Sequence, residues 1–185
     1  TDITAQKAVE LELVRQAHTD HLTGFNNRGH FMHQAELELR RVVRYGGTLS
    51  IFMMDVDHFK KINDTHGHKV GDLVLQKLAE ICRDTLRMVD IIGRVGGEEF
   101  AILLPETTEQ EAIRVAERLR QAIANAKIPL GHGLPLSITV SIGITPLMSK
   151  DDNIDVLLSF ADKALYAAKN AGRNRIFNIQ DRIGS

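Results

Sequence analysis

The stretch Asp90-Ile-Ile-Gly-Arg-Val-Gly-Gly-Glu-Glu-Phe-Ala-Ile-Leu-Leu104 decides the predicted fold. It contains two strand-like runs, Asp90–Val95 and Phe100–Leu104, and Gly96 and Gly97 lie between them. Paired glycines supply the positive φ angles that a tight hairpin needs. We therefore expect two antiparallel strands joined by a short turn.

The segments on either side of this hairpin predict a mixture of helices and strands. The short apolar run Leu49–Met54 ends at Asp55 and is typical of a strand buried on both faces. Apolar residues at helical spacing predict helices over residues 5–18, 27–44, 70–88, 108–125 and 153–171. Alternating β-branched residues predict further strands over residues 136–145 and 175–179.

The order of these elements predicts the fold class. Strand, helices, hairpin, helix and strand form the split β-α-β order of a ferredoxin-like α+β domain. We expect a central, mostly antiparallel sheet flanked by helices, with an additional helix and strand at the C-terminal end.

The composition is typical of one soluble globular domain. The chain has 185 residues, of which 43% are hydrophobic and 25% charged. A formal net charge of −1 gives no reason to expect binding to nucleic acid polymers or to an anionic membrane surface. Cys82 is the single cysteine and no apolar run reaches membrane-spanning length. We expect a cytoplasmic domain, although a full-length protein containing it could be attached to a membrane.

Two acidic pairs stand where strands are expected to end or begin. Asp55 and Asp57 follow the first strand, and Glu98 and Glu99 follow the glycine pair. In a split β-α-β sheet these segments are neighbours, so their carboxylates can converge at one sheet edge. Such oxygen ligands suit Mg²⁺. The alternative is that Asp57 caps a helix and the glutamates are solvated hairpin residues.

Other polar residues could bind a nucleotide at this edge. The cations best placed to meet a triphosphate are Lys60, Lys61, Lys169 and Arg173. Asn63 and Asp72 could read a base, because a carboxylate accepts from guanine N–H groups that adenine lacks. The backbone of Gly96 and Gly97 lets a phosphate approach closely. Ordinary roles as turn, cap and helix-end residues remain open for all of them.

Six blocks of sequence, in order, resemble the GGDEF family. They are Asp20-x-Leu-Thr-Gly-Phe-x-Asn-Arg28, Asp55-Val-Asp-His-Phe-Lys-Lys-Ile-Asn-Asp64, Gly67-His-x-x-Gly-Asp72, Arg94-Val-Gly-Gly-Glu-Glu-Phe100, Ser141-Ile-Gly-Ile144 and Ala161-Asp-Lys-Ala-Leu-Tyr-x-Ala-Lys-x-x-Gly-Arg-Asn174. The resemblance implies a palm domain like that of nucleotidyl cyclases, over residues 19–179. Residues 1–18 would then be a linker or signalling helix, and residues 180–185 a C-terminal tail.

The resemblance also implies a role for each matching residue. Asp55, Glu98 and the backbone carbonyl of Val56 would bind Mg²⁺, or Mn²⁺ in its place. Glu98 would accept the proton of the attacking ribose 3′-hydroxyl, with Glu99 close by, and Lys60 would stabilise the transition state. The substrate would be contacted by Asn63, His68, Asp72, Gly96, Gly97, Lys169 and Arg173.

The activity implied by the resemblance is that of a diguanylate cyclase, which condenses two GTP molecules into cyclic di-GMP and two pyrophosphates. Each domain would hold one GTP, so catalysis would need a homodimer. Arg87 and Asp90 match the family's inhibitory product site. The opening Thr1-Asp-Ile-Thr4 resembles the exit from an upstream PAS sensor domain. Two alternatives stay open: an inactive receptor for GTP or cyclic di-GMP, and a cyclase that closes a single purine nucleotide.

Overall fold

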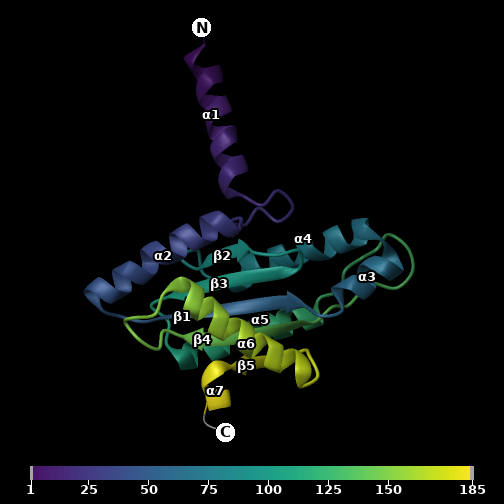
Figure 1. Cartoon of the computed structure of the whole chain (residues 1–185). Coiled ribbons are helices and arrows are strands. Elements are labelled where there is room, and N and C mark those ends of the chain that lie inside the picture. The colour runs from purple at the N-terminus through teal and green to yellow at the C-terminus, as the bar shows by residue number, and fades with distance from the viewer. Residues whose placement is uncertain (1, 184–185) are drawn as a thin grey trace.

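The computed structural model describes residues 2–183 (Figure 1). In chain order its elements are α1 (Ile3–His18), α2 (Arg28–Tyr45), β1 (Leu49–Val56), α3 (Phe59–His66), α4 (His68–Thr85), β2 (Ile91–Arg94), β3 (Glu99–Pro105), α5 (Glu109–Asn125), β4 (Val140–Pro146), α6 (Ile154–Asn170), β5 (Ile176–Asn178) and α7 (Ile179–Ile183). The predicted hairpin is β2 and β3, and the predicted buried strand is β1.

The strands form one five-stranded sheet in the order β2-β3-β1-β4-β5. β1 is central and runs antiparallel to both β3 and β4, β2 is antiparallel to β3, and β5 is parallel to β4. The predicted α+β class with a mostly antiparallel sheet is confirmed. The added helix and strand at the C-terminal end are α6 and β5.

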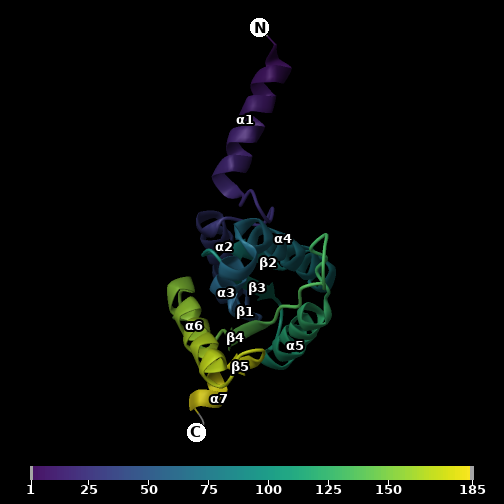
Figure 2. The same cartoon turned by 90° about the vertical axis from the view of Figure 1, so that its right-hand side faces the viewer.

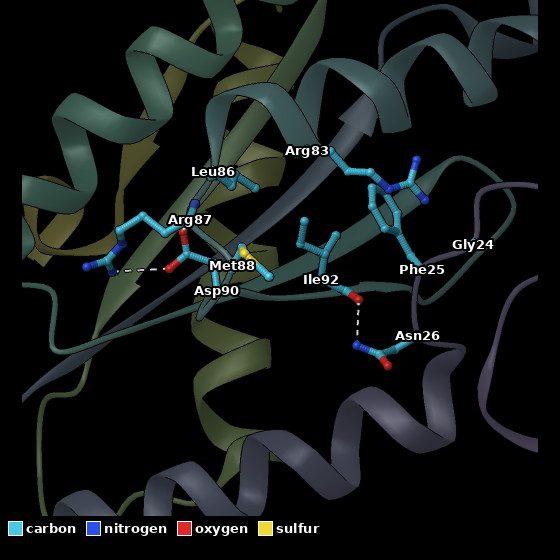
Figure 3. A pocket seen from close by; sticks show the side chains of 9 residues that line it. All are labelled: Gly24, Phe25, Asn26, Arg83, Leu86, Arg87, Met88, Asp90 and Ile92. Atoms are coloured by element: carbon cyan, nitrogen blue, oxygen red, sulfur yellow. Dashed lines mark hydrogen bonds and ion pairs between the residues drawn. The ribbon is translucent and has the colours of Figure 1, made fainter. Parts of the chain in front are cut away.

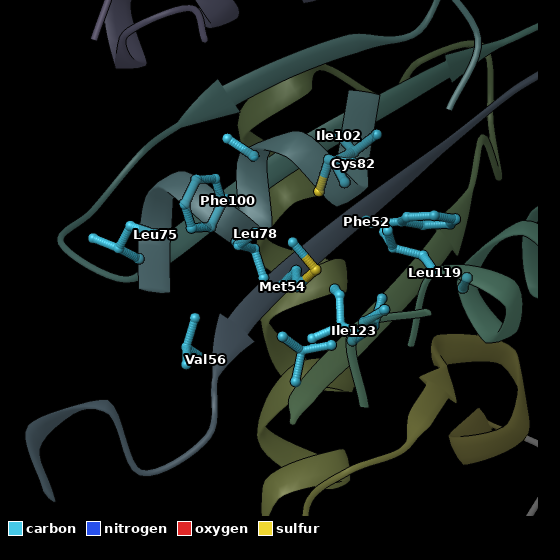
Figure 4. Packing of buried hydrophobic residues seen from close by; sticks show 14 of the residues in the cluster. Phe52, Met54, Val56, Leu75, Leu78, Cys82, Phe100, Ile102, Leu119 and Ile123 are labelled. Atoms are coloured by element: carbon cyan, nitrogen blue, oxygen red, sulfur yellow. The ribbon is translucent and has the colours of Figure 1, made fainter. Parts of the chain in front are cut away.

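Helices cover both faces of the sheet (Figure 2). α4 and α5 pack on one face, where Phe52 and Met54 of β1 point (Figure 4). α2 and α6 pack on the other face, against Ile51 and Met53. Because successive side chains of a strand point to opposite faces, a strand covered on both sides needs a continuous apolar run.

α6 lies unusually close to β4. A Cβ atom added to Gly143 would lie 2.1 Å from the carbonyl oxygen of Ala161 and 2.2 Å from the backbone nitrogen of Leu165. Both are backbone atoms of α6, so the glycine permits the approach. This contact sets the position of the helix that carries Lys169.

Several predicted element boundaries differ from the structure. The predicted strand 136–145 begins only at Val140, because Leu136 pairs with Ile128 in an isolated bridge. α3 was not predicted, and α4 begins at His68 rather than residue 70, directly after Gly67. At the C-terminus, residues 180–183 of the predicted tail all belong to α7, and residues 184–185 lie outside the described part.

The reason given for Gly96 and Gly97 was also wrong. Neither has a positive φ angle. The turn is wider than a two-residue hairpin, because the backbone N–H groups of Val95 and Gly96 both donate to the carbonyl oxygen of Glu99, at 2.9 and 3.3 Å. Gly96 instead supplies space, since an added Cβ would lie 2.9 Å from Oε2 of Glu99.

α1 projects away from the domain (Figures 1 and 2) and has no buried residue. Its end is attached by the side chain of Asn27, which donates to the carbonyl oxygen of Ala17 at 2.9 Å. The ring of His18 also stacks on that of His30, with centroids 4.1 Å apart. Among the helices of residues 2–183, none combines the length and apolar character needed to cross a membrane.

Candidate active site

The end of β1 and the β2–β3 turn lie side by side, as the sequence predicts. Asp55 pairs with Glu99 in the register of β1 and β3. The backbone N–H of Val56 donates to the carbonyl oxygen of Glu98 at 3.3 Å. The sheet therefore brings Asp55, Glu98 and Glu99 to one edge.

Asp55 is buried and ion-paired with Lys169, which reaches it from α6. Burial raises the pKa of the Asp55 carboxyl, the Lys169 ammonium lowers it, and the charges of Glu98 and Asp57 raise it, so that the net shift is upward. Burial is the largest of these effects, so the Lys169 ammonium does not offset the cost of removing this carboxylate from water. A divalent cation would suit the position.

Glu99 lies in the same electrostatic environment. Burial and the charges of Asp55 and Asp162 raise the pKa of the Glu99 carboxyl, against the opposing effect of Lys169 and Arg28. The pKa of Asp162 is raised by burial too, and Arg28 and Lys169 again oppose the shift. Arg28 and Asp162 were given no role from the sequence, although both lie in the blocks that carried the resemblance.

Asp57 does not cap a helix, so that alternative was wrong. Its carboxylate accepts hydrogen bonds from the hydroxyl groups of Thr139 at 2.7 Å and Ser141 at 2.6 Å. It also accepts one from the backbone N–H of Asn174 at 2.9 Å. The residue before α3 is His58, which has a φ of 56° and makes no side-chain cap.

The residues expected to contact the base lie on the α3–α4 helix pair, next to the end of β1 (Figure 1). Asn63 is packed so tightly against Gly71 that an added Cβ there would lie 1.9 Å from Asn63 Oδ1. That oxygen is buried and has no hydrogen-bond partner among residues 2–183. His68 and Asp72, near the start of α4, are exposed. Buried amide oxygens are normally paired, so the Oδ1 atom of Asn63 is an unsatisfied hydrogen-bond acceptor.

The predicted cations divide between two places. Lys169 reaches the acidic edge, and Arg173 follows it in the exposed turn after α6. Lys60 is exposed on the first turn of α3. Lys61 instead lines a separate cavity of about 350 Å³ between α3 and residues 136–139. Asp57 lines the same cavity, so the structure places Lys61 near Asp57, and neither Asp55 nor Glu98 lines that cavity.

The donor set at the acidic edge fits Mg²⁺ better than zinc. Within the part of the chain that the structure describes, no group of three or more His, Cys, Asp or Glu side chains is arranged to hold a metal ion. Mg²⁺ usually needs only one or two carboxylates, because waters and substrate phosphates complete its coordination. Asp55 and Glu98 supply two carboxylates at this edge, which is enough for such an ion.

Arg87 and Asp90 lie together at a second cavity, of about 360 Å³ (Figure 3). The guanidinium of Arg87 donates to Asp90 at 3.1 Å and to Thr107 Oγ1 at 2.8 Å. The side chain of Arg87 is 53% exposed and that of Asp90 only 2%. The cavity wall also includes Arg83, whose guanidinium lies 4.7 Å from the ring centre of Phe25. An exposed arginine beside an oriented carboxylate can bind an anionic or guanine-containing ligand.

The comparisons with known proteins give one consistent family. A family model described as "Diguanylate cyclase, GGDEF domain" matches residues 17–175. The chain is 45% identical over 162 residues to diguanylate cyclase DgcP of Pseudomonas aeruginosa, a match that covers 88% of this chain and 24% of DgcP. It is 38% identical over 159 residues to response regulator PleD of Caulobacter vibrioides, covering 85% of this chain and 35% of PleD.

A solved structure matches the fold as well. The coiled coil and GGDEF domain of DgcB from Caulobacter crescentus, in complex with c-di-GMP, superposes with a TM-score of 0.87 at 29% identity. The match covers 95% of this chain and 93% of that one. The predicted palm architecture is thereby confirmed. The chain spans about a third or less of the length of PleD and DgcP.

Proposed function

Because this chain belongs to the GGDEF domain family of diguanylate cyclases, we propose that it condenses two GTP molecules into cyclic di-GMP and two pyrophosphates. The observation that carries the proposal is the sheet edge where Asp55, Glu98 and Glu99 meet beside Lys169. The reaction is a displacement at the α-phosphate by a ribose 3′-hydroxyl. Such a reaction depends mainly on positioning and on compensating charge.

Asp55, Glu98 and the backbone carbonyl of Val56 would hold Mg²⁺, or Mn²⁺ in its place. When bound, the ion would neutralise charge on the phosphates and polarise their oxygens. Glu98 would accept the proton of the 3′-hydroxyl, and Glu99 would lie within reach of the same group. Gly96 and Gly97 would let the triphosphate approach the backbone.

The cations would bind the phosphates. Lys169 would leave Asp55 for a phosphate oxygen, Arg173 would bind a second one, and Lys60 would stabilise the charge that develops in the transition state. The unpaired Oδ1 atom of Asn63 supports a site for a base with N–H donors on its edge. Asp72 and His68, on the adjoining helix, would complete guanine recognition.

Two copies of this domain must face each other, because each would hold one GTP while two bonds have to form. We propose that residues 19–179 are the catalytic domain and that α1, within residues 1–18, carries a signal into it from an upstream sensor domain such as PAS. Residues 180–185 would be a tail outside the reaction. The exposed apolar residues of α1 support a helix that meets a partner: they are Ile3, Val9, Leu11, Leu13 and Val14.

Arg87 and Asp90 would form an inhibitory site for the product. The support is the cavity that both residues line and the exposure of the guanidinium. Cyclic di-GMP offers phosphates to an arginine and guanine N–H groups to a carboxylate. Since GTP is a cytoplasmic nucleotide, we place the domain in the cytoplasm.

Product analysis tests the proposal. The protein is incubated with GTP and Mg²⁺ or Mn²⁺ at concentrations that give dimers, and the nucleotides are separated by chromatography. We expect cyclic di-GMP and pyrophosphate. Unchanged GTP would favour an inactive receptor of GTP or cyclic di-GMP, and a monomeric cyclic nucleotide would favour a cyclase acting on a single purine nucleotide.

A further inference from the structure

We propose that Asp57 is a positioning residue for the triphosphate, because it holds the turn that carries Arg173 at the end of β1. The inference rests on the proposed function. It gives a task to a buried carboxylate that the reaction outlined above does not use.

The contacts of Asp57 reach two separate segments, the start of β4 and the turn after α6. Oδ1 accepts from Ser141 Oγ on β4 at 2.6 Å, and Oδ2 accepts from Thr139 Oγ1 at 2.7 Å. Oδ2 also accepts from the backbone N–H of Asn174 at 2.9 Å, in the turn between α6 and β5. Charge-assisted hydrogen bonds from buried partners are stronger than neutral ones. This carboxylate therefore connects the turn after α6 to the end of β1 and to the start of β4.

The turn needs such a connection because its backbone is strained. Arg173 and Asn174 have φ angles of 64° and 47°, in the left-handed region that side chains disfavour. A second support is Arg120 on α5, which donates to Asn174 Oδ1 at 2.7 Å. Both supports act on Asn174. The guanidinium of Arg173 makes no hydrogen bond or ion pair within residues 2–183 and stays available for a ligand.

Asp55 and Asp57 make different contacts at the end of α6: Asp55 with a side chain, and Asp57 with the backbone of the turn that follows. Asp55 holds the side chain of Lys169, a contact that must break when the ammonium turns to a phosphate. Asp57 holds a backbone N–H, and this contact need not change when a nucleotide binds. Asp57 thus keeps Arg173 in place throughout turnover.

The test uses Asp57→Ala with Asp57→Asn as the matched variant. Alanine removes every acceptor, whereas the amide oxygen of asparagine can still accept from Asn174 while its NH₂ group donates to the Ser141 hydroxyl. The probe is 3′-deoxy-GTP, which lacks the nucleophile and cannot react. By calorimetry we expect Asp57→Ala to weaken binding about tenfold or more, and Asp57→Asn by no more than about threefold. Equal affinities of Asp57→Ala and wild type, or equal losses in both variants, would overturn the proposal.

A double-mutant cycle shows whether Asp57 acts through Arg173. In the Arg173→Ala background, the further change Asp57→Ala should weaken binding by less than about twofold, because the side chain being positioned is already absent. Full additivity of the two losses would contradict the inference. Thr139→Val is the control for lost stability, since it removes one hydroxyl donor and leaves the bond to Asn174. Its affinity should stay within about twofold of wild type.

Hydrogen exchange covers the case in which Asp57→Ala does not fold. In wild type and in Asp57→Asn, the amide of Asn174 should be protected like a strand amide, although the residue is exposed. Exchange as fast as in an unbonded turn would overturn the proposal without any activity measurement. A wild-type protein that binds no 3′-deoxy-GTP would instead refute the proposed function.

Discussion

The Nζ atom of Lys169, near the end of α6, is ion-paired with Oδ2 of Asp55, near the end of β1. The side chain of Asp55 is 5% exposed and that of Lys169 is 31% exposed. The pair joins the cation proposed for a phosphate to the carboxylate proposed for a metal ion. Substrate binding would separate them, so changes at this edge should affect ligands more than the fold.

Glu98→Gln should abolish turnover and leave the fold intact. The substitution keeps the size of the side chain but removes its charge and its capacity to accept the 3′-hydroxyl proton. We expect the rate to fall by about a hundredfold or more, as measured by chromatography of cyclic di-GMP. Glu80→Gln, at an exposed position on α4, is the control and should keep the wild-type rate. A Glu98→Gln variant with wild-type turnover would show that the role is misassigned.

Arg87→Ala should relieve inhibition by the product. The side chain of Arg87 is 53% exposed and lines the cavity together with Asp90. We expect the cyclic di-GMP concentration that halves the initial rate to rise about tenfold or more. Arg40→Ala, at an exposed position on α2 outside this cavity, should leave the inhibition curve in place. Superimposable curves for Arg87→Ala and wild type would dismiss the inhibitory site.

His30 should make the stability of the α1–α2 junction depend on pH. Burial and the neighbouring His18 and His33 lower the pKa of His30 below its ordinary value of 6.5. As the pH falls below 6.5, His30 becomes protonated in the unfolded chain before it does in the folded chain. The contribution of His30 to the free energy of unfolding should therefore be fully present above pH 6.5 and be lost on acidification until the lowered pKa is passed.

The check is thermal unfolding across this pH range. His30→Phe keeps a ring against His18 but cannot be protonated, so its melting temperature should depend less on pH than that of wild type. His132→Gln, in an exposed loop, is the control and should follow the wild-type curve. If wild type and His30→Phe have the same pH dependence, the histidine stack does not contribute to it.

Gly143→Ala should destabilise the fold strongly. The new Cβ would meet backbone atoms of α6 at 2.1 and 2.2 Å, and neither atom can move without moving the helix. We expect a loss of about 3 kcal/mol in the free energy of unfolding, measured in urea. Gly97→Ala is the matched control, because nothing lies within 4 Å of its added Cβ, and it should lose less than about 0.5 kcal/mol. Equal stabilities would mean that α6 can shift freely on β4.

The main elements of the fold could be read from local patterns. β1 was predicted because a strand covered on both faces must be largely apolar, and Leu49–Met54 is apolar at every position except Ser50. α3 was missed because it has only eight residues and few apolar positions, too short for a helical period to be recognised. The start of β4 was misplaced because Leu136 continues the alternation of the strand while pairing with Ile128 instead.

The sequence by itself determined the family and the residue types of the site, because the motif blocks are contiguous and their chemistry is carried by local spacing. The sequence also predicted that the end of β1 meets the β2–β3 turn, but only the tertiary structure decided which other residues contact Asp55 and Asp57. Asp57 finds its partners 82, 84 and 117 positions away, and Lys169 lies 114 positions from Asp55. Contacts over such separations depend on how the strands pair and where α6 packs, and no local pattern of residues encodes them.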